Sequence, residues 1–223
     1  MPALGWMRAD GVGEPQILIE NERFLIPLSW HPDGRRLLVH RETDEGENDL
    51  LLLHLSGDSQ NGWSVDSQEA FLKSGSRLSN GVFSPDGDWV TNTSNESLRH
   101  RLFVRRLDGM EAVKVIPLSA FSLSGVSWSL PTSELIFADR AEGQGLLERE
   151  VFIAKYRNAD NSIVFESPRP WPGSHYTAQE GGVDFSFDPK GDRVLVRKLV
   201  DQDGQSKRGQ VVWVRNVPEL LGE

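Results

Sequence analysis

The chain has 223 residues, of which 38% are hydrophobic and 26% charged, and its formal net charge is −9. This apolar share supports a folded core, and the acidic balance argues against duplex nucleic-acid binding, because phosphate contacts need a basic face. The absence of cysteine excludes disulfides, cysteine-ligated metals and thiol catalysis, and no apolar run is long enough to span a membrane.

Short strands separated by turns are predicted along the whole chain. The 21 glycines and 12 prolines are spread throughout it, and the most helix-like stretches, residues 67–73 and 218–221, are short. In chain order, the predicted strands and strand pairs cover residues 4–8, 16–19, 28–39, 50–55, 69–73, 81–90, 102–107, 112–117, 126–137, 150–156, 162–166, 185–196 and 210–215. Residues 141–150 are predicted to be a hairpin loop, since Gly143 and Gly145 would each cost about 1 kcal/mol in a helix. The fold class is therefore all-β.

One unit recurs four times, at residues 28–39, 81–90, 126–137 and 185–196. It consists of an aromatic residue, a turn containing proline, and an apolar strand, and its copies are roughly 50 residues apart. The turn residues assigned a structural role are Pro32, Asp33, Gly34, Pro85, Asp86, Gly87, Pro131, Pro189 and Gly191. Proline fixes φ, aspartate can bond to its own backbone and glycine supplies a positive φ, so the unit predicts a tight hairpin. The third copy has lost the Asp-Gly pair.

Each full repeat supplies four antiparallel strands, and stacking such sheets around an axis predicts a β-propeller of about four blades. Residues 1–20 would be the last strands of a preceding blade, residues 21–75, 76–118 and 119–172 three blades, and residues 173–223 a final incomplete blade. The predicted strands exceed those of a closed four-bladed ring by one, which favours an open arc or a fragment of a larger propeller over a small closed ring. A generic β-sandwich is the alternative fold, but its hairpins rarely share one turn signature at this spacing.

No catalytic or metal-binding constellation is evident. The five histidines, none at a metal-ligand spacing, are His31, His40, His54, His100 and His175; a structural role is favoured, with His40 and His54 as neighbours on adjacent strands. No Gly-x-Ser-x-Gly motif points to a hydrolase. The acidic run at residues 43–49 lacks the register of a calcium loop and is predicted to be a solvated hairpin tip, as is the loop at residues 201–204. No cofactor is expected.

Charged and aromatic clusters give the candidate contact residues. Arg99, Arg101, Arg105 and Arg106 are predicted to form a mixed exposed edge rather than a binding stripe, with Arg106 on the opposite face of its strand. Four tryptophans at strand positions are predicted to be core: Trp30, Trp89, Trp128 and Trp213. Trp63 and Trp171 fall in predicted loops, and with Tyr176 they are the candidate partner-binding residues; covering the blade ends is their alternative role.

The repeat resembles the TolB-like, WD-like propeller repeat, whose core is aromatic-Ser-Pro-Asp-Gly. The match is closest at residues 83–87 and good at 30–34. Nearly the whole chain also resembles the C-terminal half of the propellers attached to bacterial serine/threonine protein kinases. The segments that carry this resemblance are residues 4–16, 94–97 with 102–109, and 211–220. The chain has no kinase motif of its own.

The resemblance implies a non-enzymatic scaffold or sensor that binds a protein or small ligand through its loops, either a TolB-like protein-interaction module or the sensor part of a bacterial serine/threonine kinase. The alternative is the accessory gating propeller of a prolyl-oligopeptidase-type peptidase, and in either case the attached domain would lie outside this chain. A propeller glycosidase would need paired carboxylates, and only Asp184 is suitably placed. A protein partner is expected, as is self-association or pairing with missing blades, but neither nucleic-acid binding nor membrane insertion. Residues 1–20 show no signal peptide, so a cytoplasmic location is expected for the chain taken by itself. If the chain is a fragment of a larger related propeller, a periplasmic or other extracytoplasmic location is expected instead.

Overall fold

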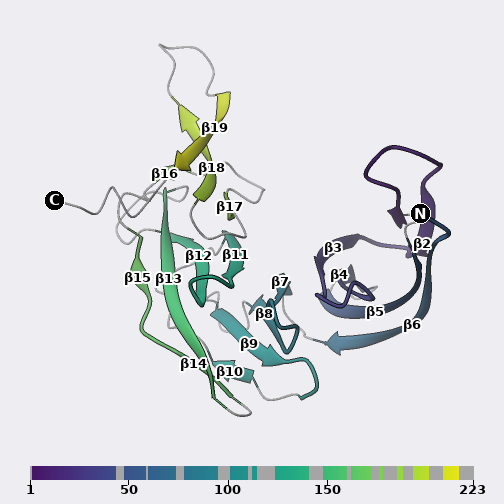
Figure 1. The fold of residues 1–223 in the computed structure, drawn as a ribbon, viewed down its shortest axis with the longest axis horizontal. Helices are drawn as coiled ribbons and strands as arrows, with labels where there is room; N and C mark the ends of the chain where they lie inside the picture. The colour runs from purple at the N-terminus through teal and green to yellow at the C-terminus, as the bar shows by residue number, and fades with distance from the viewer. Residues whose placement is uncertain are drawn as a thin grey trace. The chain divides into compact units, whose positions relative to one another are not determined.

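The computed structural model describes residues 2–43, 48–58, 60–73, 78–94, 101–109, 112–114, 124–140, 148–159, 162–171, 176–177, 185–187, 193–200 and 208–215. These residues form nineteen strands and no helix, so the all-β prediction is confirmed (Figure 1). Consequently the described part of the chain has no helix that could cross a membrane. Two compact units are present: the N-terminal unit comprises residues 1–97 and 103–112, and the C-terminal unit residues 98–102 and 113–223.

Three antiparallel sheets follow one another from the N-terminus. The first pairs β1 (Ala3–Trp6) with β2 (Gln16–Glu20). The second has the order β3 (Leu25–Trp30), β4 (Arg36–Glu42), β5 (Asn48–Asp58) and β6 (Gly62–Leu72). The third has the order β7 (Leu78–Phe83), β8 (Trp89–Ser94), β9 (Arg101–Arg106) and β10 (Ala112–Lys114). Both four-stranded sheets are simple meanders, in which each strand pairs with the next along the chain.

The strands β4 and β5 are apolar on both faces because both faces of their sheet are covered. One face buries a cluster of Leu4, Leu37, Val39, Leu51, Leu53 and Leu55, to which β1 contributes Leu4. The other face buries a cluster of Leu38, Leu50, Leu52, Leu78, Phe83 and Val90, to which β7 and β8 contribute. A continuous leucine run such as residues 50–53 is what a strand covered on both sides requires. Neighbouring sheets therefore stack face to face, as propeller blades do.

The Pro-Asp-Gly segments form the hairpin turns between the first and second strands of the two four-stranded sheets. The Gly34 N–H donates to the His31 carbonyl and the Gly87 N–H to the Ser84 carbonyl, both at 2.9 Å. The two glycines have φ of 68° and 82°, in the left-handed region that glycine tolerates best. In the first turn, the Arg35 N–H donates to Asp33 Oδ1 at 2.8 Å, which is the local bond that favours aspartate here.

The third repeat moves its turn by one residue, and four residues join its first two strands where five join them in the other two repeats. In all three repeats an N–H in the third strand, or directly after it, donates to the carbonyl of the residue just before the second strand: Leu55 to Arg35 (2.8 Å), Leu107 to Asp88 (2.9 Å) and Tyr156 to Ser133 (2.8 Å). By this register Ser133 corresponds to Arg35, one position after Gly34. Ser133 itself has φ of 50°, so a serine has taken the left-handed position.

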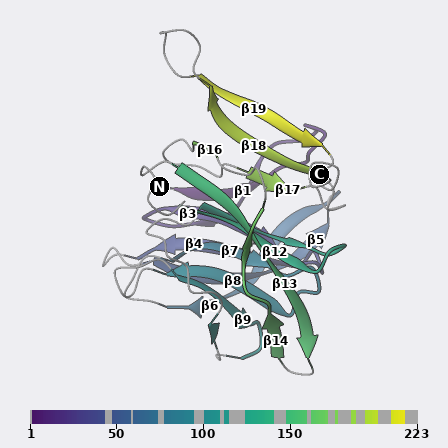
Figure 2. The same cartoon turned by 90° about the vertical axis from the view of Figure 1, so that its left-hand side faces the viewer.

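The C-terminal unit contains a sheet of β11 (Ser124–Ser129), β12 (Glu134–Arg140) and β13 (Glu148–Ala159), and a three-stranded sheet. The latter has the order β17 (Phe185–Phe187), β18 (Arg193–Val200) and β19 (Arg208–Arg215), and its two long strands form a ribbon (Figure 2). Residues 188–192, which include Pro189 and Gly191, lie outside the described residues.

A single fourth strand was predicted at residues 162–166, but the outer edge of β13 pairs with more than one strand. Three short strands occupy this edge in turn: β14 (Ser162–Phe165), β15 (Arg169–Pro170) and β16 (Tyr176–Thr177). Pro168 and Pro170 have no N–H to donate, so a continuous ladder cannot form through them.

The strand predicted at residues 69–73 is confirmed as the end of β6, which also takes in the helix-like residues from Ser67. One further local expectation differs from the structure. The loop predicted for residues 141–150 ends earlier, since β13 begins at Glu148; residues 141–147 lie outside the described residues, as do 218–221.

Candidate interaction site

Trp30 and Trp63 meet at one end of the second sheet. The burial predicted for Trp30 and the loop position predicted for Trp63 were both wrong. Trp30, predicted to be core, ends β3 and is 46% exposed. Trp63, predicted to lie in a loop, is a residue of β6 and packs against the cluster around Leu53. Their ring centroids are 6.1 Å apart with planes tilted by 57°. Trp30 is thus supported by Trp63 on one side and open to solvent on the other.

The hairpin between β5 and β6 holds Trp63 in place. Asp58 Oδ1 accepts hydrogen bonds from the N–H groups of Gln60 (2.8 Å) and Asn61 (2.7 Å). The bond from Asn61 is the largest of the effects that lower the pKa of Asp58. Gly57 has φ of 121°, and a Cβ on it would lie 2.1 Å from the Gly62 carbonyl oxygen. The hairpin is therefore tightly closed, which limits the positions open to Trp63.

The other two candidate contact residues lie along the outer edge of β13. The Trp171 N–H donates to the Val151 carbonyl at 2.7 Å, and the side chain is half-buried. Tyr176 is a residue of β16, whose backbone pairs with Arg149; its side chain lies outside the described part. The structure therefore brings Trp171 and Tyr176 to one strand edge of the C-terminal unit, while Trp63 joins Trp30 in the N-terminal unit.

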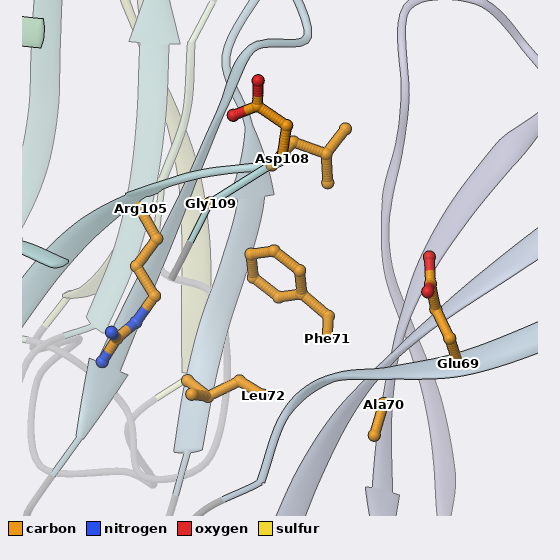
Figure 3. A pocket seen from close by; sticks show the side chains of 8 residues that line it. Glu69, Ala70, Phe71, Leu72, Arg105, Asp108 and Gly109 are labelled. Carbon is orange, nitrogen blue, oxygen red and sulfur yellow. The ribbon is translucent and has the colours of Figure 1, made fainter. Parts of the chain in front are cut away.

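A cavity of about 170 Å³ lies in the N-terminal unit at the end of β6. Its lining residues are Glu69, Ala70, Phe71, Leu72, Arg105, Leu107, Asp108 and Gly109. The Phe71 ring projects into the middle of these side chains, between Arg105 and Glu69 (Figure 3). Sequence reasoning missed this cavity, although the apolar pair Phe71 and Leu72, shortly after the polar residues 66–69, was a usable signal.

The charged groups around the cavity are engaged locally. Arg105 Nε donates to Asn92 Oδ1 at 3.0 Å, and its guanidinium lies 5.2 Å from the centre of the Phe103 ring. Arg106 makes two bonds of 2.8 Å to the Asp108 carboxylate, which hold the pKa of Asp108 below its usual value. The two arginines thus have different partners. Their strand β9 lies between β8 and β10 and both side chains are half-buried, so the predicted exposed edge is wrong for Arg105 and Arg106; Arg99 lies outside the described residues.

The described histidines have structural surroundings. His31 is buried: the Asp33 N–H donates to its Nδ1 (3.1 Å), and its Nε2 donates to the Gly87 carbonyl of the next sheet (3.1 Å). His40 and His54 lie on the adjacent strands β4 and β5, but they are not opposite one another, since His40 faces Leu50 and His54 faces Arg36 across the ladder. His100 and His175 lie outside the described residues.

The acidic run was predicted to be a solvated tip, and for Asp49 this was wrong. Asp49 is buried in β5 and pairs with Arg41 Nη2 at 2.9 Å; residues 44–47 and 201–204, like Asp184, are not described. A buried carboxylate needs such a partner, which explains the arginine directly across the ladder. No group of three potential metal-ligating side chains occurs among the residues that the structure describes.

Comparison with known proteins identifies the fold. No protein-family model and no curated protein matches the sequence. The solved structure of TolB from Acinetobacter baumannii is similar over 93% of this chain and 47% of its own, with 13% identity and a TM-score of 0.57. A protein from Agrobacterium tumefaciens assigned as TolB matches over 74% of this chain and 56% of its own, with 16% identity and a TM-score of 0.54. One from Bacteroides uniformis assigned as a 6-phosphogluconolactonase matches over 95% and 67%, with 13% identity and a TM-score of 0.51.

These similarities confirm a β-propeller fold, built from four-stranded antiparallel blades. The chain spans about half the length of the TolB structures that it matches. At this level of identity the likeness concerns the fold alone, because one fold supports many functions.

Proposed function

We propose that this chain is a non-catalytic β-propeller module that binds a protein partner at the exposed face of Trp30. The observation that carries the proposal is the tryptophan pair: Trp30 is 46% exposed, and Trp63 holds its ring from one side. Tryptophans that are rigid before binding are the commonest anchors of protein interfaces, because they bury a large area at little entropic cost.

The surroundings of two buried carboxylates support a non-catalytic role. Asp49 pairs with Arg41, and Glu134 with Arg169 at 3.4 Å. Both carboxylates thus have a stabilising partner within their own sheet, whereas a catalytic acid or base is usually found in a cleft that admits a substrate.

The test compares wild-type protein with Trp30→Ala and with Ile17→Ala, an apolar control that is 64% exposed in β2 of the same unit. Each variant is immobilised, proteins of the source cells are passed over it, and any retained protein is purified and titrated calorimetrically. The expected result is one partner whose affinity falls about 30-fold or more with Trp30→Ala, as for an interface hot spot, and stays unchanged with Ile17→Ala. A partner that binds Trp30→Ala as tightly as wild type refutes this docking site.

A second part of the proposal concerns an attached domain, and it rests on the resemblance of residues 4–16, 94–97 with 102–109, and 211–220 to kinase-associated propellers. Our proposal is that the module is the sensor part of a bacterial serine/threonine kinase. An antibody against this chain tests it, by the mass of the native polypeptide and by phosphate transfer from labelled ATP in the precipitate. A large polypeptide with kinase activity supports the proposal, a large one with peptidase activity supports the gating alternative, and a polypeptide near 25.0 kDa refutes both.

A further inference from the structure

The cavity at the end of β6 adjoins a strand edge. In its sheet β6 is the last strand, and among the described residues only β5 pairs with it. Residues 69–72 belong both to this edge and to the cavity lining. A peptide that added a strand to the edge would therefore pass directly over the cavity, which is how strand addition combines backbone affinity with a side-chain pocket.

A β-bulge aims Phe71 at the cavity. Leu50 pairs with Leu72 and Leu51 with Ala70, so Phe71 is opposed by no residue of β5. Such a bulge redirects a side chain from its regular position, and the Phe71 ring occupies the centre of the cavity lining (Figure 3). The apolar wall is completed by Leu72 and Leu107, both half-buried.

The size of the cavity sets the size of its occupant. Its volume of about 170 Å³ is close to that of an engineered apolar protein cavity of roughly 150 Å³ that binds benzene. The cavity thus accommodates one phenyl-sized side chain, which would pack against Phe71 with the usual offset or edge-to-face geometry of aromatic pairs.

The charge of the edge selects the residues that flank this side chain. Residues 62–72 include Asp66 and Glu69 but neither lysine nor arginine. Glu69 is 63% and Asp108 68% exposed at the cavity rim, whereas Arg105 is bonded inward to Asn92. Glu69 Oε1 lies 3.0 Å from His54 Nε2, and Asp108 is bonded to Arg106. A lysine or arginine on either side of the anchor would therefore share these exposed carboxylates with their present partners.

We propose that β6 binds an extended basic segment of a partner protein, which pairs with the strand edge and inserts one aromatic side chain into the cavity beside Phe71. This is a second site, since Trp30 and Trp63 do not line the cavity. The segment bound at this second site carries an aromatic anchor flanked by basic residues.

The probe is the blocked pentapeptide Lys-Val-Phe-Val-Lys, titrated into the full chain labelled with nitrogen-15 and followed by NMR. The expected result is saturable binding in the millimolar range or tighter, with amide shifts confined to residues 62–72 and 105–109. Replacing the peptide's phenylalanine by alanine should weaken binding about tenfold or more, since a buried phenyl ring contributes most of the free energy. Replacing its lysines by glutamates should also weaken it.

Gly109 supplies the matched variants. A Cβ at Gly109 meets no atom within 4 Å, so Gly109→Trp can fill the cavity from its rim while Gly109→Ala leaves it open. We expect Gly109→Trp to abolish peptide binding and Gly109→Ala to retain it. Glu69→Lys should weaken binding roughly threefold, as for an exposed ion pair, and Glu20→Lys, a charge reversal on β2, should not.

Three results would overturn the proposal: unchanged affinity in Gly109→Trp, equal affinity for the glutamate peptide, or no amide shift with wild type at about 5 mM peptide. Trp30→Ala should bind this peptide as wild type does. The failure of this proposal is therefore distinguishable from failure of the docking site at Trp30.

Discussion

Replacing Gly87 with alanine tests how two neighbouring blades hold each other. A Cβ at Gly87 would lie 2.2 Å from Nε2 of the buried His31, and the backbone there has φ of 82°. The left-handed conformation costs an alanine about 1–2 kcal/mol. Displacing the ring also breaks its hydrogen bond to the Gly87 carbonyl, worth about 1 kcal/mol. The expected loss of unfolding free energy is therefore about 2–3 kcal/mol.

Gly34 is the matched control, because it occupies the same turn position with φ of 68° but no atom lies within 4 Å of its Cβ position. Gly34→Ala should cost only the conformational part, about 1–2 kcal/mol. The assay is urea unfolding followed by far-ultraviolet circular dichroism. Adding His31→Ala to Gly87→Ala should recover part of the difference, since the clash disappears. If Gly87→Ala is no more destabilising than Gly34→Ala, the contact between the blades contributes nothing and this reasoning is refuted.

Three further predictions concern the turns and the tryptophans. Partial burial works to raise the pKa of Asp33, but hydrogen bonds from the Arg35 N–H and the Arg36 side chain outweigh it and lower the pKa to about 2. The carboxylate therefore stabilises the fold above about pH 4 and loses this effect as the pH falls towards 2. After a discount for the 36% exposure of the Asp33 side chain, the loss of unfolding free energy is about 1 kcal/mol. It should appear as a fall in the urea midpoint of the wild type at low pH, and Asp33→Asn should not show this fall. Ser133→Gly should raise stability by about 0.5–1 kcal/mol by relieving a left-handed serine; a drop in the urea midpoint would contradict this. Trp128→Ala, at a residue 8% exposed, should lower the free energy of unfolding by about 3–5 kcal/mol, whereas Trp30→Ala should lower it by about 1 kcal/mol. Equal losses would mean that Trp30 belongs to the core after all.

Properties that depend on a few adjacent residues were predictable from the sequence. The Pro-Asp-Gly turns need only their own residues, since proline, aspartate and glycine each favour one step of the same backbone path. The apolar run at residues 50–55 likewise predicted a strand, and the structure has β5 there with Leu50, Leu51, Leu52 and Leu53 all buried.

Predictions failed where a residue's setting depends on another part of the chain. Trp30 and Trp128 occupy corresponding strand positions, yet 46% of the first and 8% of the second is exposed. Trp128 packs edge-on against Tyr156 at 5.1 Å and is also close to Phe165, whereas the aromatic partner found for Trp30 is Trp63 alone among the described residues. The pattern around each tryptophan is similar, so its burial could not be read from the repeat.

The cavity shows the same limit. Phe71 and Leu107 are separated by more than thirty positions in the sequence and meet because two blades stack face to face. The bulge that aims Phe71 depends on how β6 aligns with β5, and neither strand specifies that alignment alone, since a shift of one residue reverses every side chain.

By itself, the sequence determined the strands, their turns and the repeat, because backbone preferences and period-two hydrophobicity act over a few residues. Only the tertiary structure decided that Asp49 is buried against Arg41, that Trp30 remains open and that a cavity borders β6. Burial and pairing depend on which surfaces come together when the sheets stack, and that is a property of contacts between residues far apart in the chain.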